Sequence, residues 1–410
     1  MTIDTSTNTA PTVSNVESVD ELLERSGDEI IEKEHFQQSL TSGKKLRIKM
    51  GFDPTKPDLH LGHAVGLKIL RKLQDEGHTI IFIIGDYTAK IGDPSGRNST
   101  RPVLTDEEIK QNADTYFQQV SKILDTSKVE IMYNSEWFIK MAFEDIFKLC
   151  GNFTVRNIIE REDFQKRMKD QSDIGMHELL YPMMQAYDSV QVKADVEFGG
   201  TDQKLNMLAG RNLQKKMGQQ SQDVVTVKLL VGLDGKKKMS KSLDNYIGIT
   251  DSANEMYGKV MSIPDSAIVE YFKLCTDVKL SVVDVIEKEL IDGKRNPREI
   301  KAELSKLIVE QYHSAEEAEN AETEFNRVFR DKEQPSEMKI KEIIEEECRL
   351  DDLLLKCDLV ASKAEGQRLI SQGGIQINSE KKNDSQEIIK ITNEMVIRSG
   401  KRNFVKIKKV

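Results

Sequence analysis

Apolar residues gather in short runs along the first half of the chain, and longer amphipathic stretches separate these runs. Five runs are typical of β-strands, at residues 46–52, 78–88, 128–134, 194–200 and 223–232. The first alternates apolar and polar residues, and the second contains a continuous Ile/Phe stretch. Strands that alternate with helices favour βαβ units, and therefore predict a parallel sheet covered on both faces.

The rest of the pattern divides the chain into further parts. The stretch VDELLERSGDEIIEKEHFQQSLTSG predicts one amphipathic helix that ends at Gly43. From about residue 250 onward, apolar positions recur at helical spacing. The polar segment 330–337 looks like a linker, and a short mixed α/β segment follows it. We therefore predict a tail at 1–20, an α/β domain at 21–249, a helical domain at 250–329, a linker at 330–347 and a small α/β domain at 348–410.

Length and composition agree with such a multidomain globular protein. The 410 residues are 38% hydrophobic and 31% charged, and no apolar run has the length of a membrane span. The first twenty residues are polar and lack the features of a signal or transit peptide, so we expect a disordered tail. Four cysteines lie far apart without a CxxC pair, which suggests neither a zinc cage nor a disulfide framework. We expect a cytoplasmic protein.

Charge is distributed unevenly along the chain. The net charge is −9, but residues 349–410 contain 13 Lys/Arg and only 8 Asp/Glu. A basic terminal module on an acidic body suggests that a polyanion binds at one end. An ordinary lysine-rich surface explains the same numbers equally well.

The first candidate for chemistry is the stretch DLHLGH, residues 58–63. It places His60 and His63 between a strand and a helix that begins near Gly62, where backbone N–H groups and the helix dipole favour an anion. A two-histidine metal site would need a third ligand nearby, and the next histidine, His78, follows the helix. Imidazoles that donate to phosphate oxygens fit better, although a solvated turn is the common meaning of such a motif alone.

The second candidate is DGKKKMSKS, residues 234–242. Lysines at a strand exit can neutralise a polyphosphate, and the small Ser240 and Ser242 allow the loop to move as charge develops. A solvated lysine run is the alternative.

The two candidates together are far more specific than either one. HLGH followed about 175 residues later by KMSKS resembles the paired signature of class I aminoacyl-tRNA synthetases. The resemblance implies a Rossmann-like catalytic domain, with 234–245 as its mobile loop. It also implies that the histidines bind ATP phosphates and stabilise a pentacovalent α-phosphate, without a metal cage.

Two further stretches point to a pocket for a small ligand. YPMMQAYD places Tyr181, Gln185 and Asp188 on one helix face, where they would form either a structural network or a pocket for an ammonium group and a hydroxyl. EFGGTDQ follows a strand, and its glycines permit close approach to a sugar, although a plain turn would look the same. IGDPSGRNSTR would by itself be an ordinary surface loop.

With these stretches, the chain from about residue 20 to 410 resembles the tyrosyl-tRNA synthetases of bacteria. For tyrosine, the resemblance implies that Tyr181, Gln185 and Asp93 hold the ammonium group. Asp188 would accept the phenolic hydroxyl, and Gln203 would face the carboxylate.

The same resemblance implies a set of residues for ATP. Gly200 and Asp202 would bind the ribose, and Asp53 would contribute to nucleotide binding. The phosphates would be contacted by residues of two motifs and one loop: Thr55, His60, Gly62, His63, Lys238, Lys241, Arg97 and Arg101.

One position departs from the family pattern. The best-known members have a tyrosine two residues before the Gly-Phe-Asp-Pro segment, where it helps to bind the substrate hydroxyl. This chain has Lys49 there. Hydroxyl recognition is therefore expected to rest mainly on Asp188.

The C-terminal segment resembles the S4-like RNA-binding domain. Residues 348–378 predict a helix, a second helix that begins near Ser362, and a QGG turn into a strand. Basic helix faces suit structured RNA, which is read largely by shape; a small structural cap is the alternative. The expected RNA-binding residues are Arg349, Lys356, Lys363 and Arg368.

The resemblance implies a tyrosine–tRNA ligase that activates tyrosine with ATP and Mg²⁺ and then charges tRNA. It also implies an anticodon-binding role for the helical domain, and a homodimer. A tryptophanyl-type enzyme is the nearest alternative, disfavoured by the Tyr181, Gln185 and Asp188 array and by the S4-like segment. Two alternatives come from other functional classes: an RNA-binding scaffold that keeps an inert synthetase fold, and a nucleotidyltransferase that activates another small molecule.

Overall fold

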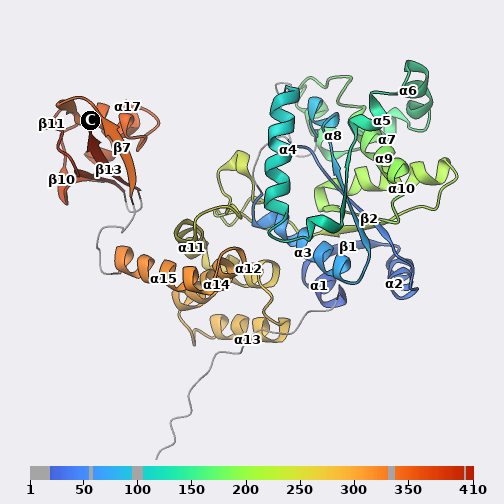
Figure 1. The fold of residues 1–410 in the computed structure, drawn as a ribbon, viewed down its shortest axis with the longest axis horizontal. Helices are drawn as coiled ribbons and strands as arrows, with labels where there is room; N and C mark the ends of the chain where they lie inside the picture. Colours follow the sequence, from blue (N-terminus) through green and yellow to red (C-terminus); the bar gives the residue numbers. More distant parts are fainter. Residues whose placement is uncertain (1–18, 55–58, 95–104, 331–337, 401–402) are drawn as a thin grey trace, which may run out of the picture. The chain divides into compact units, whose positions relative to one another are not determined.

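A computed structural model describes residues 19–54, 59–94, 105–330, 338–400 and 403–410 (Figure 1). The expected disordered tail therefore lies almost entirely outside the described residues. The chain forms two compact units, Met1–Ala321 and Glu322–Val410. In the described part of the chain, no helix is long and apolar enough to cross a membrane.

A six-stranded sheet forms the centre of the N-terminal unit, with the strand order β1-β6-β5-β2-β3-β4. Its strands are β1 (Gly27–Ile31), β2 (Arg47–Phe52), β3 (Thr79–Ile84), β4 (Val129–Tyr133), β5 (Val196–Gly200) and β6 (Asp223–Val227). Strands β2 to β6 are parallel, as predicted, and the edge strand β1 runs antiparallel to β6. Five of the six residues of β3 are buried, which explains its continuous apolar sequence.

Helices cover both faces of this sheet (Figure 1). Successive residues of a strand point to opposite faces, so two neighbours in β2 identify which helix lies on which side. The side chain of Met50 reaches the backbone of α3 (Leu61–Asp75) near Gly66, whereas Lys49 contacts α9 (Tyr181–Val192). α3 and α9 therefore lie on opposite faces, and α10 (Lys204–Lys216) packs beside α9.

The single N-terminal helix predicted from the sequence is wrong. The segment forms α1 (Val19–Ser26), strand β1 and α2 (Lys33–Thr41). Glu32 has a left-handed backbone with φ 61°, which breaks the helical path. The residues before it gain ladder hydrogen bonds at the open edge of β6, where Ile30 pairs with Val225. This pairing with a distant strand outweighs the local helical pattern.

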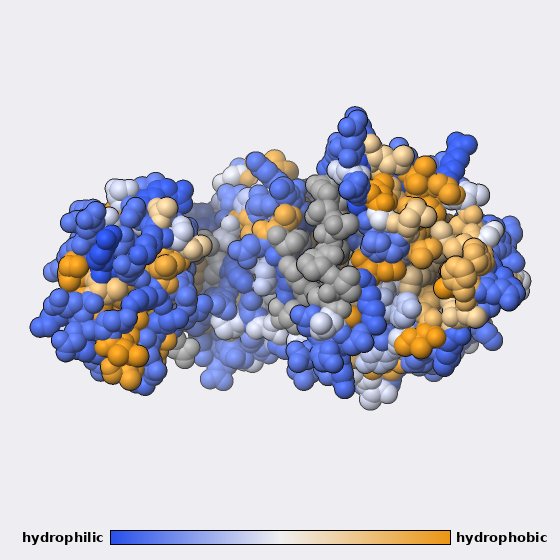
Figure 2. Space-filling view, turned by 90° about the horizontal axis from the view of Figure 1, so that it is seen from above, coloured by the Kyte–Doolittle hydropathy of each residue, from blue (hydrophilic) through white to orange (hydrophobic). Residues whose placement is uncertain are grey.

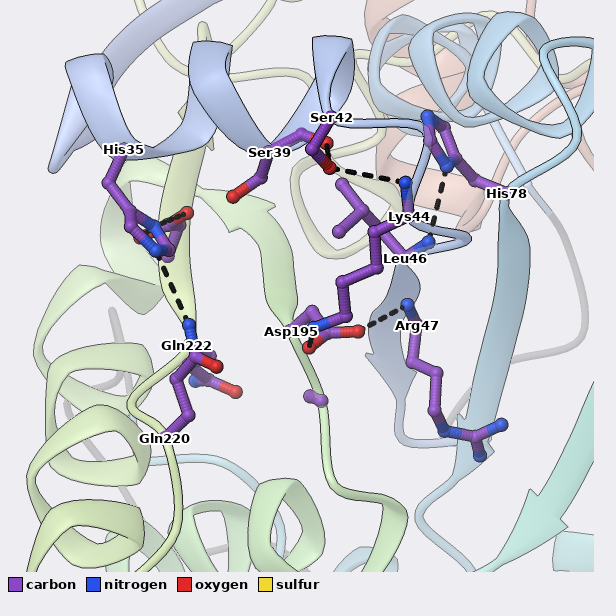
Figure 3. Close-up of polar contacts among 12 residues, drawn as sticks. His35, Ser39, Ser42, Lys44, Leu46, Arg47, His78, Asp195, Gln220 and Gln222 are labelled. Atoms are coloured by element: carbon purple, nitrogen blue, oxygen red, sulfur yellow. Dashed lines mark hydrogen bonds and ion pairs between the residues drawn. The ribbon is translucent and has the colours of Figure 1, made fainter.

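Polar contacts tie together the starting ends of the parallel strands (Figure 3). Asp195, just before β5, accepts hydrogen bonds from Lys44 Nζ at 2.6 Å and from the backbone N–H of Arg47 at 2.9 Å. The backbone N–H of Leu46 donates to His78 Nδ1 at 3.3 Å. These contacts fix β2 against β3 and β5 at one end of the sheet.

The remaining helices of the N-terminal unit follow the predicted pattern. Arg25 of α1 donates to the backbone carbonyl oxygens of Thr276 at 3.1 Å and Val278 at 2.6 Å, and so joins the sheet domain to the helices after residue 250. The remaining helices before residue 250 are α4 (Asp106–Val120), α5 (Ser135–Phe138), α6 (Phe143–Cys150), α7 (Val155–Ile159) and α8 (Glu162–Lys169). Those after it are α11 (Ala253–Met261), α12 (Ile268–Cys275), α13 (Leu280–Ile291), α14 (Pro297–Tyr312) and α15 (Ala315–Phe329), and α15 runs into the second unit.

The C-terminal unit packs two helices on a five-stranded sheet with the order β10-β9-β12-β13-β7. Its elements are β7 (Lys339–Ile343), β8 (Glu347–Arg349), α16 (Leu350–Lys356), α17 (Lys363–Ser371), β9 (Ile375–Ile377), β10 (Glu380–Lys382), β11 (Ile388–Lys390), β12 (Val396–Ser399) and β13 (Asn403–Lys409). Leu350, Leu353 and Ile370 of the helices are buried with Ile375 and Ile397 of the sheet.

Strand β7 lies inside the segment that we predicted as a linker, 330–347. It pairs in parallel with β13, for example Ile340 with Lys406. The strand completes the sheet edge, and its short, charged sequence gives little local sign of this role.

Candidate active site

A cavity of about 360 Å³ opens at the carboxyl ends of the parallel strands. This edge of an open α/β sheet is where ligands commonly bind. Most of the residues expected to bind tyrosine or ATP line it: Asp53, His60, Gly62, His63, Asp93, Tyr181, Gln185, Asp188, Gly200, Asp202, Gln203 and Lys238. Lys241 is not among the lining residues, and Thr55, Arg97 and Arg101 fall outside the described residues.

His60 and His63 occupy the first turn of α3. His60 is the N-cap residue, and its backbone N–H donates to Nδ1 of His63 at 3.2 Å. The proton of the neutral His63 ring is therefore on Nε2, where it can be donated to a ligand. The buried Nδ1 of His60 has no hydrogen-bond partner among the described residues. A Cβ on Gly62 would lie 3.1 Å from the His60 ring, so glycine leaves room for this imidazole.

The electrostatics of the site keep both imidazoles neutral. Burial lowers the pKa of His60 to about 2, helped by His63, Lys241 and Lys238. Burial and the same two lysines lower the pKa of His63 to about 4. Both groups therefore act as neutral hydrogen-bonding groups at physiological pH, not as cations.

Backbone hydrogen bonds hold the HLGH motif beside the segment that follows the KMSKS loop. The N–H of Leu61 donates to the carbonyl of Ile247 at 3.0 Å, and the N–H of Ile249 donates to that of Leu59 at 3.1 Å. Lys238 lines the same cavity as the histidines, and its Nζ lies 2.6 Å from Asp202 Oδ2.

Lys241 Nζ lies 5.5 Å from the centre of the Tyr246 ring. It is close enough to lower the pKa of both histidines, yet it is not among the residues that line the cavity.

Helix α9 carries three residues of the second group. Proline at its start fixes the first turn, and the spacing of Tyr181, Gln185 and Asp188 points all three at the cavity. The Tyr181 hydroxyl donates to Asp53 Oδ2 at 2.9 Å, and Gln203 Nε2 donates to Asp93 Oδ2 at 2.6 Å. The expected ammonium and carboxylate ligands thus make up a polar wall of the cavity.

Asp188 also lines the cavity and is buried. Its carboxylate accepts hydrogen bonds from Trp137 Nε1 at 3.0 Å and from Asn134 Nδ2 at 3.4 Å. Burial raises the pKa of this carboxyl to about 7, although Lys49 and the two donors oppose the rise. Neither Trp137 nor Asn134 was predicted from the sequence, because a lone tryptophan just after a strand is a weak local signal.

Lys49, the residue that departs from the family pattern, is fully buried. Its Nζ donates to the backbone carbonyl of Gln185 at 3.1 Å, to Ser189 Oγ at 2.8 Å and to Glu197 Oε1 at 2.9 Å. An ammonium group has three N–H donors, so all of them are engaged within the protein. These contacts leave no N–H of Lys49 for another acceptor. Glu197 was not predicted from the sequence.

The four residues expected to bind RNA are exposed on α16, α17 and the residue before α16. Three of them have carboxylate partners: Arg349 with Asp351 at 2.8 Å, Lys356 with Glu345, and Lys363 with Asp352. These partners offset part of the positive charge on that face. Arg368 lies on the exposed side of α17.

Two family profiles together match most of the chain. Residues 41–330 match tRNA synthetases class I (W and Y), and residues 331–407 match the C-terminal domain of tyrosine–tRNA ligases of the SYY type.

Individual relatives and solved structures agree. The chain is 46% identical over 399 residues to tyrosine–tRNA ligase 2 of Clostridium acetobutylicum, covering 96% of this chain and 99% of the relative. It is 46% identical to the tyrosine–tRNA ligase of Thermotoga maritima, covering 94% and 96%.

In fold, it is similar to a C-terminally truncated mitochondrial tyrosyl-tRNA synthetase of Aspergillus nidulans, with a TM-score of 0.62 and 22% identity over 76% of this chain and 94% of that one. It is also similar to the Archaeoglobus fulgidus enzyme complexed with L-tyrosine, with a TM-score of 0.59 and 23% identity over 75% and 100%. The chain belongs to the tyrosine–tRNA ligases, within the class I aminoacyl-tRNA synthetases.

Proposed function

We propose that the cavity at the strand ends is the place where this ligase forms tyrosyl-adenylate. As a tyrosine–tRNA ligase, the enzyme uses ATP to attach tyrosine to tRNA. The observation that carries the placement is the meeting of two distant segments on one cavity, which is lined by His60 and His63 and also by Lys238. No single local motif would create this arrangement.

In this proposal, the polar wall of the cavity binds tyrosine. Tyr181, Gln185 and Asp93 surround the ammonium group, Gln203 faces the carboxylate, and Asp188 accepts the phenolic hydroxyl. The support is that all five line the cavity, and that Asp188 is buried deepest among them.

ATP would lie across the other end of the cavity. Asp53 contacts the nucleotide, and Gly200 and Asp202 contact the ribose. A Cβ on Gly200 would meet Leu229 at 3.1 Å, so glycine leaves more room at this position. His60 and His63 donate to phosphate oxygens beside the open backbone of Gly62. Lys238 would leave its ion pair with Asp202 and bind the phosphates, and Lys241 would come closer to the phosphates when its loop moves. The roles of Thr55, Arg97 and Arg101 rest on the sequence motifs alone.

The chemistry follows from placement and charge. The tyrosine carboxylate attacks the α-phosphate of ATP, the bond to pyrophosphate breaks, and tyrosyl-adenylate forms. Then the terminal ribose hydroxyl of tRNA takes the tyrosyl group and AMP leaves. Neutral imidazoles and lysine cations stabilise the negative charge of the transition state without a covalent enzyme intermediate.

We propose that Mg²⁺ enters as the substrate complex Mg·ATP. Within the described residues, no group of three or more His, Cys, Asp or Glu is arranged to hold a metal ion. Magnesium is usually held by substrate phosphates and few protein ligands, so an open cavity beside the phosphate-binding turn suits such a complex.

A pyrophosphate-exchange panel over the twenty amino acids tests the assignment of the pocket. We expect exchange with tyrosine and at least about tenfold less with phenylalanine, because one hydrogen bond to a buried charge is at stake. Charging of tRNA would follow with tyrosine alone. Equal exchange with tryptophan or phenylalanine would contradict the proposed pocket.

The domain boundaries and the roles of the later domains are also proposals. The helices at 250–329 would contact the anticodon region, and the C-terminal unit would bind tRNA through Arg349, Lys356, Lys363 and Arg368. The support is their exposure on two adjacent helices.

A truncated chain that ends at Arg330 should separate the two activities. We expect pyrophosphate exchange within about twofold of the full chain, because the cavity lies wholly in the first compact unit. Binding of tRNA should weaken, with a smaller salt dependence, because phosphate contacts are lost. Exchange rate and tRNA Kd measure these effects. Equal loss of both activities would show that the C-terminal unit is not a separate RNA-binding part.

We also propose a homodimer through the surface around α5 to α7. Figure 2 shows hydrophobic side chains gathered on this part of the N-terminal unit. Ile139, Phe143, Phe147 and Val155 are 64% to 73% exposed, which is unusual for a contiguous apolar surface on a monomer.

Phe147→Asp should convert the dimer into a monomer at micromolar concentration, because a charge would be buried without a partner. Sedimentation velocity measures the change, and Met176→Asp, on an exposed residue outside these helices, is the control. A wild-type chain that sediments as a monomer would contradict the proposal.

The enzyme is proposed to act in the cytoplasm. All four cysteines, Cys150, Cys275, Cys348 and Cys357, are free thiols, which suits a reducing compartment. Burial raises the pKa of Cys275 and Cys357 to about 12 and about 11, which makes them poor nucleophiles.

A further inference from the structure

We propose that Lys49, held in place by its buried partner Glu197, keeps Asp188 a carboxylate and that the balance of these two charges sets the preference for tyrosine over phenylalanine. Lys49 is a positioning residue in this proposal, because its three donors are engaged within the protein although it lines the cavity. The inference rests on the proposed role of Asp188 as the acceptor of the tyrosine hydroxyl. It gives a function to the position at which this chain departs from the family pattern.

The contacts of Lys49 bracket Asp188 on helix α9. Its Nζ donates to the carbonyl of Gln185, three residues before Asp188, and to Oγ of Ser189, the next residue. The ammonium group thus lies against the turn of α9 that carries the carboxylate. It holds that turn to strand β2 and brings a positive charge to the cavity lining.

Glu197 completes the pair from strand β5. Its Oε1 accepts from Lys49 at 2.9 Å and from Gln185 Nε2 at 3.2 Å, and its Oε2 accepts from Ser189 Oγ at 3.0 Å and from Gln222 Nε2. A buried ion pair is favourable only when further hydrogen bonds satisfy its atoms, and this one meets that condition. It also connects to Gln185, which faces the proposed ammonium site.

The charges and donors around Asp188 have opposing effects. Lys49 favours the ionised carboxyl, as do the N–H donors of Trp137 and Asn134, whereas Glu197 disfavours it and burial does so most strongly. Tyr181, on the same helix, is also buried, and its pKa is raised well above its usual value, so it stays neutral. With its pKa at about 7, Asp188 is sensitive to any change in the pair.

This balance determines how well tyrosine is distinguished. An ionised carboxyl accepts a strong, charge-assisted hydrogen bond from the phenol, and phenylalanine leaves that charge buried without this partner. A protonated carboxyl makes only a neutral hydrogen bond, which is roughly half as strong. The ratio of kcat/KM for tyrosine to that for phenylalanine should therefore be higher above the Asp188 pKa than below it.

The test compares Lys49→Met with Glu197→Gln in pyrophosphate exchange from pH 5.5 to 9. Lys49→Met removes the positive charge and leaves Glu197, so the midpoint of the tyrosine-to-phenylalanine ratio should move up by about one pH unit or more. Glu197→Gln keeps the shape but removes the negative charge, so the midpoint should move down. The double variant should lie between the two, and Lys49→Arg should remain close to the wild type.

Opposite shifts distinguish this role from a structural one, because both single variants break the same ion pair. Glu178→Gln, which breaks the buried Arg167–Glu178 pair outside the cavity lining, is the matched control and should leave the midpoint unchanged. Shifts of the same sign, or no shift in a folded Glu197→Gln protein, would overturn the inference. If Asp188→Asn keeps the wild-type ratio, the proposed role of Asp188 fails instead, so the two failures are separable.

Discussion

Asp188→Asn should remove most of the preference of this enzyme for tyrosine over phenylalanine. Asparagine keeps the size of the side chain and can still accept from Trp137 Nε1, but it has no charge. A hydrogen bond to a buried charged group contributes about 1.5–3 kcal/mol, so the ratio of kcat/KM values should fall about 10- to 100-fold. The fall should come from slower tyrosine activation, with phenylalanine unchanged or faster. Pyrophosphate exchange with each amino acid measures both.

A fold defect would look different from this result. It would lower exchange with both amino acids and weaken ATP binding at the far end of the cavity. Thermal unfolding and the KM for ATP are therefore the controls. A ratio that stays at the wild-type value in a folded variant would remove Asp188 from hydroxyl recognition.

His60→Ala and His63→Ala should each lower kcat for tyrosyl-adenylate formation by about 10²- to 10³-fold, as expected for loss of a donor to developing charge. The KM for tyrosine should change little, because neither imidazole lies on the tyrosine wall. Burial lowers the pKa of His60 to about 2 and that of His63 to about 4, so both rings are neutral at physiological pH. The wild-type rate should therefore show no histidine titration between pH 6 and 9. Single-turnover kinetics over that range measure it.

His177→Ala is the matched control, because His177 is exposed and is not among the residues that line the cavity. We expect wild-type kinetics from it. A rate that depends on a group with a pKa near 6.5, and that loses this dependence in His60→Ala, would contradict neutral imidazoles.

Much of the fold could be read from local sequence patterns. The five predicted strands correspond to β2 to β6. The clearest of them is β3, because a parallel strand buried on both faces needs a nearly continuous apolar run. The two signature motifs were equally readable, since each depends on adjacent residues at a strand end. The ends of the strands were predicted less well: the run at 78–88 predicts a longer strand than β3, which ends at Ile84. The pattern of apolar residues does not show at which residue a strand stops pairing with its neighbour.

Edges and buried partners depended on the tertiary structure. β1 and β7 form because each finds an open sheet edge, β6 and β13, and neither has a strong strand pattern. Lys49 looked like an unexplained substitution until Glu197, 148 residues later, was placed beside it. Trp137 and Asn134 became visible only as donors to Asp188.

The sequence by itself therefore determined the family and the parallel sheet, and it predicted the chemistry at the strand ends. These features depend on short runs whose meaning is local. Only the tertiary structure showed which buried charges pair with each other, and at which sheet edges the extra strands β1 and β7 form. Coulomb interactions and ladder hydrogen bonds act over a few ångströms in space, and no spacing along the chain specifies which distant residues come that close.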